Sequence, residues 1–156
     1  MSWDSQRSAD RDPNGIVIFG GTAGSDVADK ICAYLELKRA RATIGRFPDG
    51  ETLVKVEEDV RGKDVFIVQP TCPPVNDNLM ELLIFIDCLR RASAKRITAV
   101  IPYYGYARQD RKSEGRTPIT AKLVANMLTS AGVNRVVTMN LHADQIRDSS
   151  TFPWII

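Results

Sequence analysis

The pattern of apolar and polar positions divides the chain into short strands that alternate with longer helices. Apolar runs of four or five residues, typical of buried strands in parallel sheets, recur along the sequence. Between them lie segments with apolar residues at helical spacing. The expected strands are 16–19, 65–68, 97–101 and 135–139. This alternation predicts an α/β fold with a mainly parallel sheet flanked by helices on both faces, a Rossmann-like three-layer arrangement.

The ends of the two later helices carry local signals. Asn76 or Asp77 is the expected N-cap of a long helix that follows the prolines at 70–74. Thr117 is the expected N-cap of the next helix, and Pro118 occupies the first helical position, where proline is best tolerated. We expect that helix to end at Gly132, since glycine is the preferred residue after a helix C-terminus.

Three glycines follow the first strand. Gly20, Gly21 and Gly24 precede a helical pattern that begins near Ser25. A strand, glycines and a helix are also found in dinucleotide-binding folds, but the spacing here is not Gly-x-Gly-x-x-Gly. We therefore favour a tight turn over a phosphate-binding loop.

A β-hairpin is predicted at about 42–57, because two strand-like segments flank a Pro-Asp-Gly turn. Two interpretations of its tip remain open on the pattern alone. Asp49 and Gly50 could serve only to form the turn. Alternatively, the hairpin presents Phe47, Asp49 and Glu51 together as a binding surface.

The loop after the strand at 97–101 combines aromatic and charged residues. It contains three tyrosines, then a run of charges at 108–112, and it leads into the N-terminus of a helix. Such a loop at the carboxyl end of a parallel strand is suited to an anion, and neighbouring aromatic rings suit a base with its phosphates. The alternative is a solvated basic loop.

His142, the single histidine, follows the last expected strand. It therefore lies at the edge of the sheet where ligands bind in such folds. From its position alone it is either a hydrogen-bonded structural residue or a ligand for a substrate or metal.

Composition limits the class of protein. The chain has 156 residues, 44% of them hydrophobic, and a net charge of +2. These values indicate one domain with a real core, without the charge that nucleic acid or an acidic membrane would demand. No apolar run is long enough for a membrane span, and three cysteines without metal-type spacing indicate a cytoplasmic protein. We expect residues 1–14, which are polar and mixed in charge, to form a disordered leader.

Four motifs in order identify a family resemblance. They are Phe-Pro-Asp-Gly-Glu at 47–51, Asn-Asp-Asn-Leu-Met-Glu-Leu-Leu at 76–83, Tyr-Ala-Arg-Gln-Asp-Arg-Lys at 106–112 and Pro-Ile-Thr-Ala-Lys-Leu-Val-Ala-Asn at 118–126. Together they resemble the N-terminal half of ribose-phosphate pyrophosphokinase, and the likeness makes 15–146 one such domain. The resemblance implies a phosphoribosyltransferase-like fold and transfer of the diphosphoryl group of MgATP to ribose 5-phosphate. It also implies a homo-oligomer, from dimer to hexamer, with Mg²⁺ as cofactor.

The same resemblance assigns roles to individual residues. The hairpin residues would contact adenine from a neighbouring subunit, and the charged loop would form the other side of the ATP pocket. His142 would meet the metal–ATP complex. These roles agree with the needs of a nucleotide, since adenine requires an aromatic face and a triphosphate requires arginine and Mg²⁺. The implied ATP-binding residues are Phe47, Asp49, Glu51, Arg108, Gln109, Asp110 and Lys112.

The sequence also departs from the family. Asn140 stands where the family usually has an aspartate before Leu-His, which removes a potential magnesium ligand. The family's C-terminal catalytic domain, with its paired aspartates and its lysine–arginine loop, is absent from these 156 residues. We therefore expect the chain to be inactive alone. The alternative is a non-catalytic regulatory or interaction subunit that associates with full-length synthetase.

The last ten residues, 147–156, carry a separate prediction. The family typically continues Gln-Gly-Phe-Phe-Asp-Ile-Pro-Val-Asp-His, whereas this chain reads Arg-Asp-Ser-Ser-Thr-Phe-Pro-Trp-Ile-Ile. One choice of codons for this tail, read one base out of register, encodes the family continuation. We therefore expect an aberrant, frameshifted tail whose Trp154, Ile155 and Ile156 are exposed for lack of a pocket. The alternative is a tail that covers a bare sheet edge.

Sequencing the DNA around the codon for Ile146 tests this expectation. A frame that continues into the family sequence indicates an error in the recorded tail, and a frame disrupted by one base indicates a mutation. DNA in which no other frame encodes the family continuation would refute the frameshift.

Overall fold

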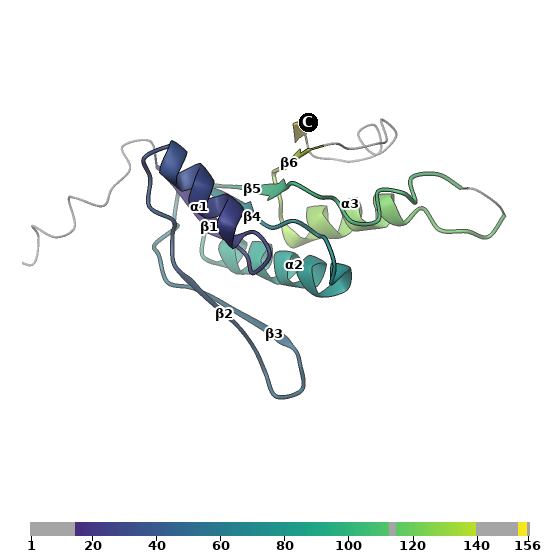
Figure 1. Cartoon of the computed structure of the whole chain (residues 1–156), viewed down its shortest axis with the longest axis horizontal. Coiled ribbons are helices and arrows are strands. Elements are labelled where there is room, and N and C mark those ends of the chain that lie inside the picture. Colours follow the sequence, from purple (N-terminus) through teal and green to yellow (C-terminus); the bar gives the residue numbers. More distant parts are fainter. Residues whose placement is uncertain (1–14, 113–114, 140–152, 156) are drawn as a thin grey trace, which may run out of the picture.

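A parallel sheet forms the centre of the protein, as the apolar runs predicted. A computed structural model describes residues 15–112, 115–139 and 153–155. All pairs of neighbouring strands in this sheet are parallel, in the order β1-β4-β5-β6-β7 (Figure 1). The strands are β1 Ile16–Gly20, β4 Asp64–Val68, β5 Arg96–Ile101, β6 Arg135–Thr138 and β7 Trp154–Ile155.

Helices cover both faces of the sheet, so the three-layer prediction is confirmed. Ile18 of β1 packs with Ala28 and Cys32 of one helix, while Phe19 points to the other face and meets Phe85 at a ring distance of 5.4 Å. Successive residues of a strand face opposite ways, which lets one strand serve both layers. None of the described helices has the length and apolarity of a membrane span. The helices are α1 Ser25–Tyr34, α2 Val75–Arg91 and α3 Thr120–Ala131.

The predicted starts of the two later helices were wrong. The carbonyl of Pro74 accepts the first helical bond of α2, from the N–H of Asn78 at 3.1 Å, so Asn76 lies inside the first turn. In α3 the N–H of Ala121 donates to the carbonyl of Gln109 at 3.1 Å. A residue earlier in the loop after β5 therefore accepts this bond, and Ile119, not Thr117, is the N-cap.

The end of α3 agrees with the prediction. Gly132 has a φ of 115° in the left-handed region, and its N–H donates to the carbonyls of Leu128 and Thr129. A side chain would strain this conformation, which explains the glycine.

The predicted hairpin is present and extends away from the sheet (Figure 1). Its strands β2, Ala42–Arg46, and β3, Thr52–Val56, are antiparallel, with Arg46 opposite Thr52. The N–H of Phe47 donates to the carbonyl of Glu51 at 2.8 Å and closes the turn. Alternate apolar residues of both strands pack against the main core, which leaves the tip to solvent.

The end of the chain corrects the expectation for Trp154. Strand β7 pairs with β6, and the Trp154 ring lies 5.4 Å from that of Tyr104, so this side chain is partly buried. Parallel pairing with β6 provides the pocket, in agreement with the alternative of a tail that covers a sheet edge. The exposure predicted for Ile155 is confirmed, at 46%. The leader at 1–14, the tail residues 147–152 and Ile156 lie outside the described residues.

A buried polar network joins the loop after β1, the residue after β4 and helix α2. Glu81 of α2 is only 6% exposed and Gln69, after β4, is fully buried. The Glu81 carboxylate accepts hydrogen bonds from the N–H of Thr22 at 2.6 Å, from the Thr22 hydroxyl at 2.8 Å and from Gln69 Nε2 at 3.0 Å. Gln69 Oε1 accepts from the N–H of Ala23 at 3.2 Å. The network ties the loop after β1 to α2.

This network explains the glycines of that loop. A Cβ on Gly24 would lie 1.9 Å from the carbonyl oxygen of Val68, and one on Gly21 would lie 2.4 Å from Oε1 of Gln69. The N–H of Gly24 donates to the carbonyl of Gly21 at 3.1 Å, so the segment forms the tight turn that we favoured. Close packing against β4 accounts for the absence of side chains.

We expect Glu81→Ala to lower the free energy of unfolding by about 1–3 kcal/mol, because buried donors on Thr22 and Gln69 lose their acceptor. Urea denaturation of the folded chain measures the change. Asp87→Ala on the same helix is the matched control, since Asp87 forms an exposed pair with Arg91 worth at most about 0.5 kcal/mol. Equal losses in both variants would contradict the role assigned to Glu81.

Candidate functional site

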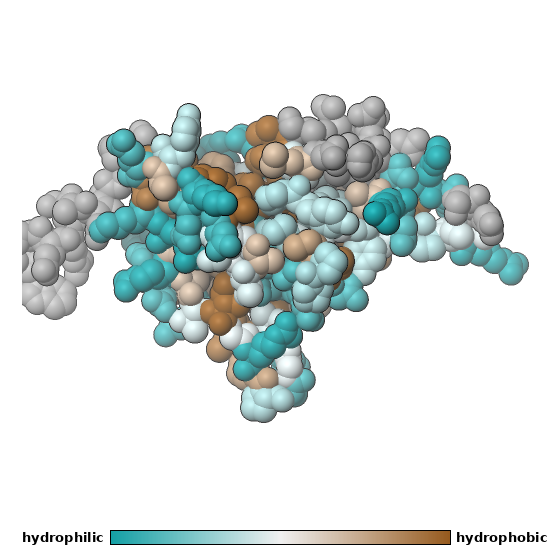
Figure 2. All heavy atoms as spheres, viewed as in Figure 1, coloured by the Kyte–Doolittle hydropathy of each residue, from teal (hydrophilic) through white to brown (hydrophobic). Residues whose placement is uncertain are grey.

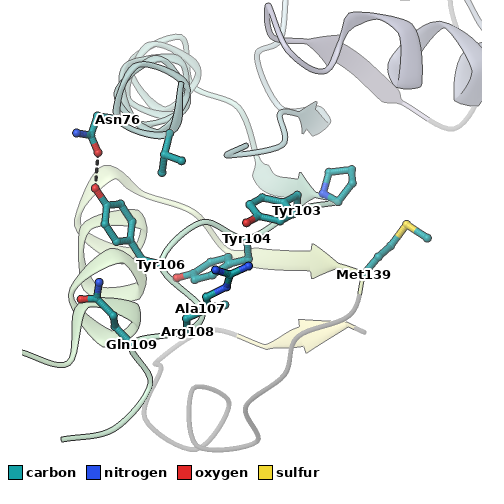
Figure 3. A pocket seen from close by; sticks show the side chains of 10 residues that line it. Asn76, Tyr103, Tyr104, Tyr106, Ala107, Arg108, Gln109 and Met139 are labelled. Atoms are coloured by element: carbon teal, nitrogen blue, oxygen red, sulfur yellow. Dashed lines mark hydrogen bonds between the residues drawn. The ribbon is translucent and has the colours of Figure 1, made fainter. Parts of the chain in front are cut away.

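A cavity of about 690 Å³ lies at the carboxyl ends of β5 and β6 (Figure 3). The N-terminus of α2, the loop after β5 and the residue after β6 form its walls. This is where ligands bind in open parallel sheets, because the loops that follow neighbouring strands converge there. The lining residues are Val75, Asn76, Pro102, Tyr103, Tyr104, Tyr106, Ala107, Arg108, Gln109 and Met139.

The loop after β5 is held against the end of β4. The N–H of Thr71 donates to the carbonyl of Tyr103 at 2.8 Å, and the N–H of Gly105 donates to the Thr71 hydroxyl at 2.7 Å. A Cβ on Gly105 would lie 2.6 Å from the Thr71 carbonyl oxygen and 2.9 Å from Cγ1 of Val75. The backbone of the loop therefore packs directly on the segment that leads into α2.

The three tyrosines of the loop have different environments. Tyr104 is 6% exposed and donates its hydroxyl to the carbonyl of Ala121 at 3.3 Å; burial raises the pKa of this phenol. Tyr106 has a φ of 67° and donates to Oδ1 of Asn76. Tyr103 is half exposed at the rim. Tyr104 thus anchors the loop to α3, and Tyr106 anchors it to α2.

The family resemblance predicted that Arg108 and Gln109 form one side of an ATP pocket, and both residues line this cavity. Gln109 accepts a hydrogen bond from the hydroxyl of Thr120, which fixes it to the start of α3. Arg108 is exposed and forms no ion pair with any residue that the structure describes. Its guanidinium group is available to an anion or an aromatic ligand.

The other predicted ATP residues do not line the cavity. Asp110 and Lys112 continue the same loop beyond its wall, and Lys112 is exposed. His142, predicted to meet the metal–ATP complex, lies outside the described residues.

The hairpin tip is also separate from this cavity. Phe47 is 47% exposed, and Asp49 and Glu51 are exposed beside it. Figure 2 shows the hairpin projecting from the body of the protein, with its tip free of other described segments. Arg46, the last residue of β2 before the turn, pairs with Asp77 of α2 at 3.3 Å, which holds the hairpin to the helix close to its tip.

The described residues do not supply a metal site. No three histidine, cysteine or carboxylate side chains gather anywhere in the described ranges, and neither histidine nor carboxylate is among the residues that line the cavity. Since Mg²⁺ requires oxygen ligands, the described walls would leave its coordination to a bound phosphate and water.

Several residues of the site were not predicted from the sequence. Asn76 was interpreted as a helix cap and as part of a family motif, and Met139 as the end of a strand, without a role in the cavity for either. The sequence also gave no role to Gln69 and Glu81 of the buried polar network, although one signal was present. Glu81 lies on the buried face of α2 beside Leu82 and Phe85, where a carboxylate needs partners.

We expect Gly105→Ala to lower the free energy of unfolding by about 1–3 kcal/mol, because its Cβ would overlap the Thr71 backbone and push the loop outward. Urea denaturation measures the loss. Gly115→Ala in the same connection is the control, since nothing lies within 4 Å of its added Cβ. Unchanged stability of Gly105→Ala would show that the loop is not fixed at Thr71.

Comparison with known proteins places this geometry in a family. The N-terminal domain of ribose phosphate pyrophosphokinase, as a family model, matches residues 16–132. A ribose-phosphate pyrophosphokinase of Rhodopirellula baltica is 70% identical over 132 residues, which cover 85% of this chain and 42% of that protein. The one from Fusobacterium nucleatum is 60% identical over 140 residues, or 90% of this chain and 44% of that protein.

A solved structure agrees. The crystal structure of phosphoribosylpyrophosphate synthetase from Mycobacterium smegmatis matches with a TM-score of 0.87 and 45% identity, over 90% of this chain and 47% of that one. The chain spans less than half the length of each of these relatives. It belongs to the ribose-phosphate pyrophosphokinase family and corresponds to the N-terminal domain.

Proposed function

We propose that this chain is the ATP-binding and subunit-contact half of a ribose-phosphate diphosphokinase. That enzyme would transfer the diphosphoryl group of ATP to ribose 5-phosphate and yield phosphoribosyl pyrophosphate and AMP. Family membership supports the reaction class. The observation that carries the nucleotide assignment is the cavity at the ends of β5 and β6, where Arg108 stands beside tyrosine rings and the Gln109 amide.

Each wall of the cavity suits one part of a nucleotide. The tyrosine rings offer apolar surface for a base, and the amides of Asn76 and Gln109 offer hydrogen-bond partners for its edge. The Arg108 guanidinium can bind phosphate or stack on the base. Asp110 and Lys112 follow along the loop and would act on the phosphate side.

Mg²⁺ would bind as part of the ATP complex. The walls described here carry no carboxylate, so phosphate oxygens and water would supply most ligands, with His142 as the proposed protein contact. The ion would neutralise charge on the phosphates.

The hairpin tip would complete the site of a second copy of the chain. Phe47, Asp49 and Glu51 are exposed and do not line the cavity of their own chain, so a partner would bring an aromatic face and carboxylates to the nucleotide. A twofold arrangement would satisfy both copies at once, since each lends its hairpin to the other. The proposed state is therefore a homo-oligomer.

We expect Arg108→Ala to weaken ATP binding about tenfold or more, because a charge-assisted contact is worth roughly 1.5–3 kcal/mol. Titration calorimetry with MgATP measures it. Arg111→Ala is the matched control, since Arg111 is an exposed arginine of the same loop that does not line the cavity. Equal affinities of Arg108→Ala and the parent chain would refute the nucleotide assignment.

The shared site has its own test. A Phe47→Ala variant should also lose affinity, and mixing it with Arg108→Ala should restore about a quarter of the parent sites, because random exchange makes half of the dimers mixed and each mixed dimer has one intact site. If the mixture is shown to exchange subunits but binding is not restored, the shared site is refuted. Phe47 and Arg108 then either belong to a site within one chain or do not share a site.

We expect the purified chain to form no phosphoribosyl pyrophosphate from ATP and ribose 5-phosphate. The groups that would position ribose 5-phosphate and stabilise the transferred charge are not among its residues, and phosphoryl transfer depends on both effects. A coupled assay of protein free from host enzyme measures this. The expectation would be overturned if the parent chain formed product and the Arg108→Ala variant did not.

A further inference from the structure

We propose that Trp154 is a positioning residue for the cavity, holding Tyr104 and, through it, the loop at 102–109 in the shape that lines the site. The sequence of the tail departs from the family pattern, and it suggested no role for the tail in the site. The link to nucleotide affinity rests on the function proposed above, whereas the link to loop geometry does not.

The backbone of the tail is paired with the sheet next to the cavity. Trp154 stands opposite Val136 and Ile155 opposite Val137 in a parallel register. The N–H of Val136 donates to the carbonyl of Pro153 at 3.1 Å. These contacts set the Trp154 side chain on the face of the sheet that carries α3 and the main core.

The Trp154 ring then meets the most buried tyrosine of the cavity. Its centroid lies 5.4 Å from that of Tyr104 at an interplanar angle of 67°, an edge-to-face contact. Such contacts add to the apolar burial because the positive edge of one ring faces the negative face of the other. Ile155, the next residue of β7, is exposed. Trp154 is therefore the residue through which β7 contacts Tyr104.

Tyr104 is the link from the tail to the loop. Its hydroxyl is bound to the carbonyl of Ala121 at the start of α3, and its ring is packed by Trp154. Its neighbours Tyr103 and Gly105 are both bound to Thr71. Without Trp154, the Tyr104 ring loses one side of its packing, and the loop on either side of it gains freedom toward the cavity.

Hydrogen exchange of the whole chain without ligand tests the positioning role. In Trp154→Ala we expect the amides at 103–109 to exchange about three- to tenfold faster, while those of β1 and β4 keep the parent rate. Trp154→Phe should restore the parent rate, because it keeps an aromatic edge, and Ile155→Ala is the matched control. Unchanged exchange at 103–109, or a uniform rise across the sheet, would overturn the proposal.

Two further measurements keep the result decisive. If Trp154→Ala does not fold, Trp154→Leu keeps apolar volume without the ring and should show the same local acceleration; parent-like exchange in it would overturn the aromatic contact. ATP affinity should fall about three- to tenfold in Trp154→Ala, or in Trp154→Leu if that variant replaces it, and should recover in Trp154→Phe. A parent chain that binds no ATP would refute the proposed function, while the exchange result would still decide the role of Trp154.

Discussion

A buried carboxylate organises the end of the sheet at which the cavity lies. Glu81 is almost fully removed from water and accepts hydrogen bonds from the backbone and hydroxyl of Thr22 and from Gln69. An unpaired carboxylate in this position would cost several kilocalories per mole, so the loop after β1, the end of β4 and α2 must meet in one arrangement. Because the network fixes α2, it also fixes Val75 and Asn76, which start that helix and line the cavity.

Helix α2 connects the two parts of the proposed nucleotide site. Its first turn binds Tyr106 of the cavity loop through Asn76, and Asp77, the next residue, pairs with Arg46, which borders the hairpin turn. The hairpin strands pack on the same core as the helix. One helix therefore sets where the cavity opens and where the hairpin projects, two features that a twofold assembly would need in a constant relation.

The cavity loop itself depends on contacts far away in the sequence. It rests on Thr71 after β4, on Ala121 in α3 and on Trp154 in β7. These partners come from the segment after β4, from α3 and from β7, so the shape of the cavity depends on how these three segments pack.

The sequence by itself determined the elements whose causes are local. The apolar runs specified four parallel strands, the Pro-Asp-Gly turn specified the hairpin, and Gly132 marked the end of α3. The charged loop after a strand end drew attention to Arg108, and the family resemblance added Gln109; both residues line the cavity. Only the tertiary structure decided the helix starts, the roles of Asn76 and Met139, and the burial of Trp154. The start of α3, the role of Asn76 and the burial of Trp154 each depend on a contact between residues far apart in the sequence, and the spacing of residues along the chain carries no record of such contacts.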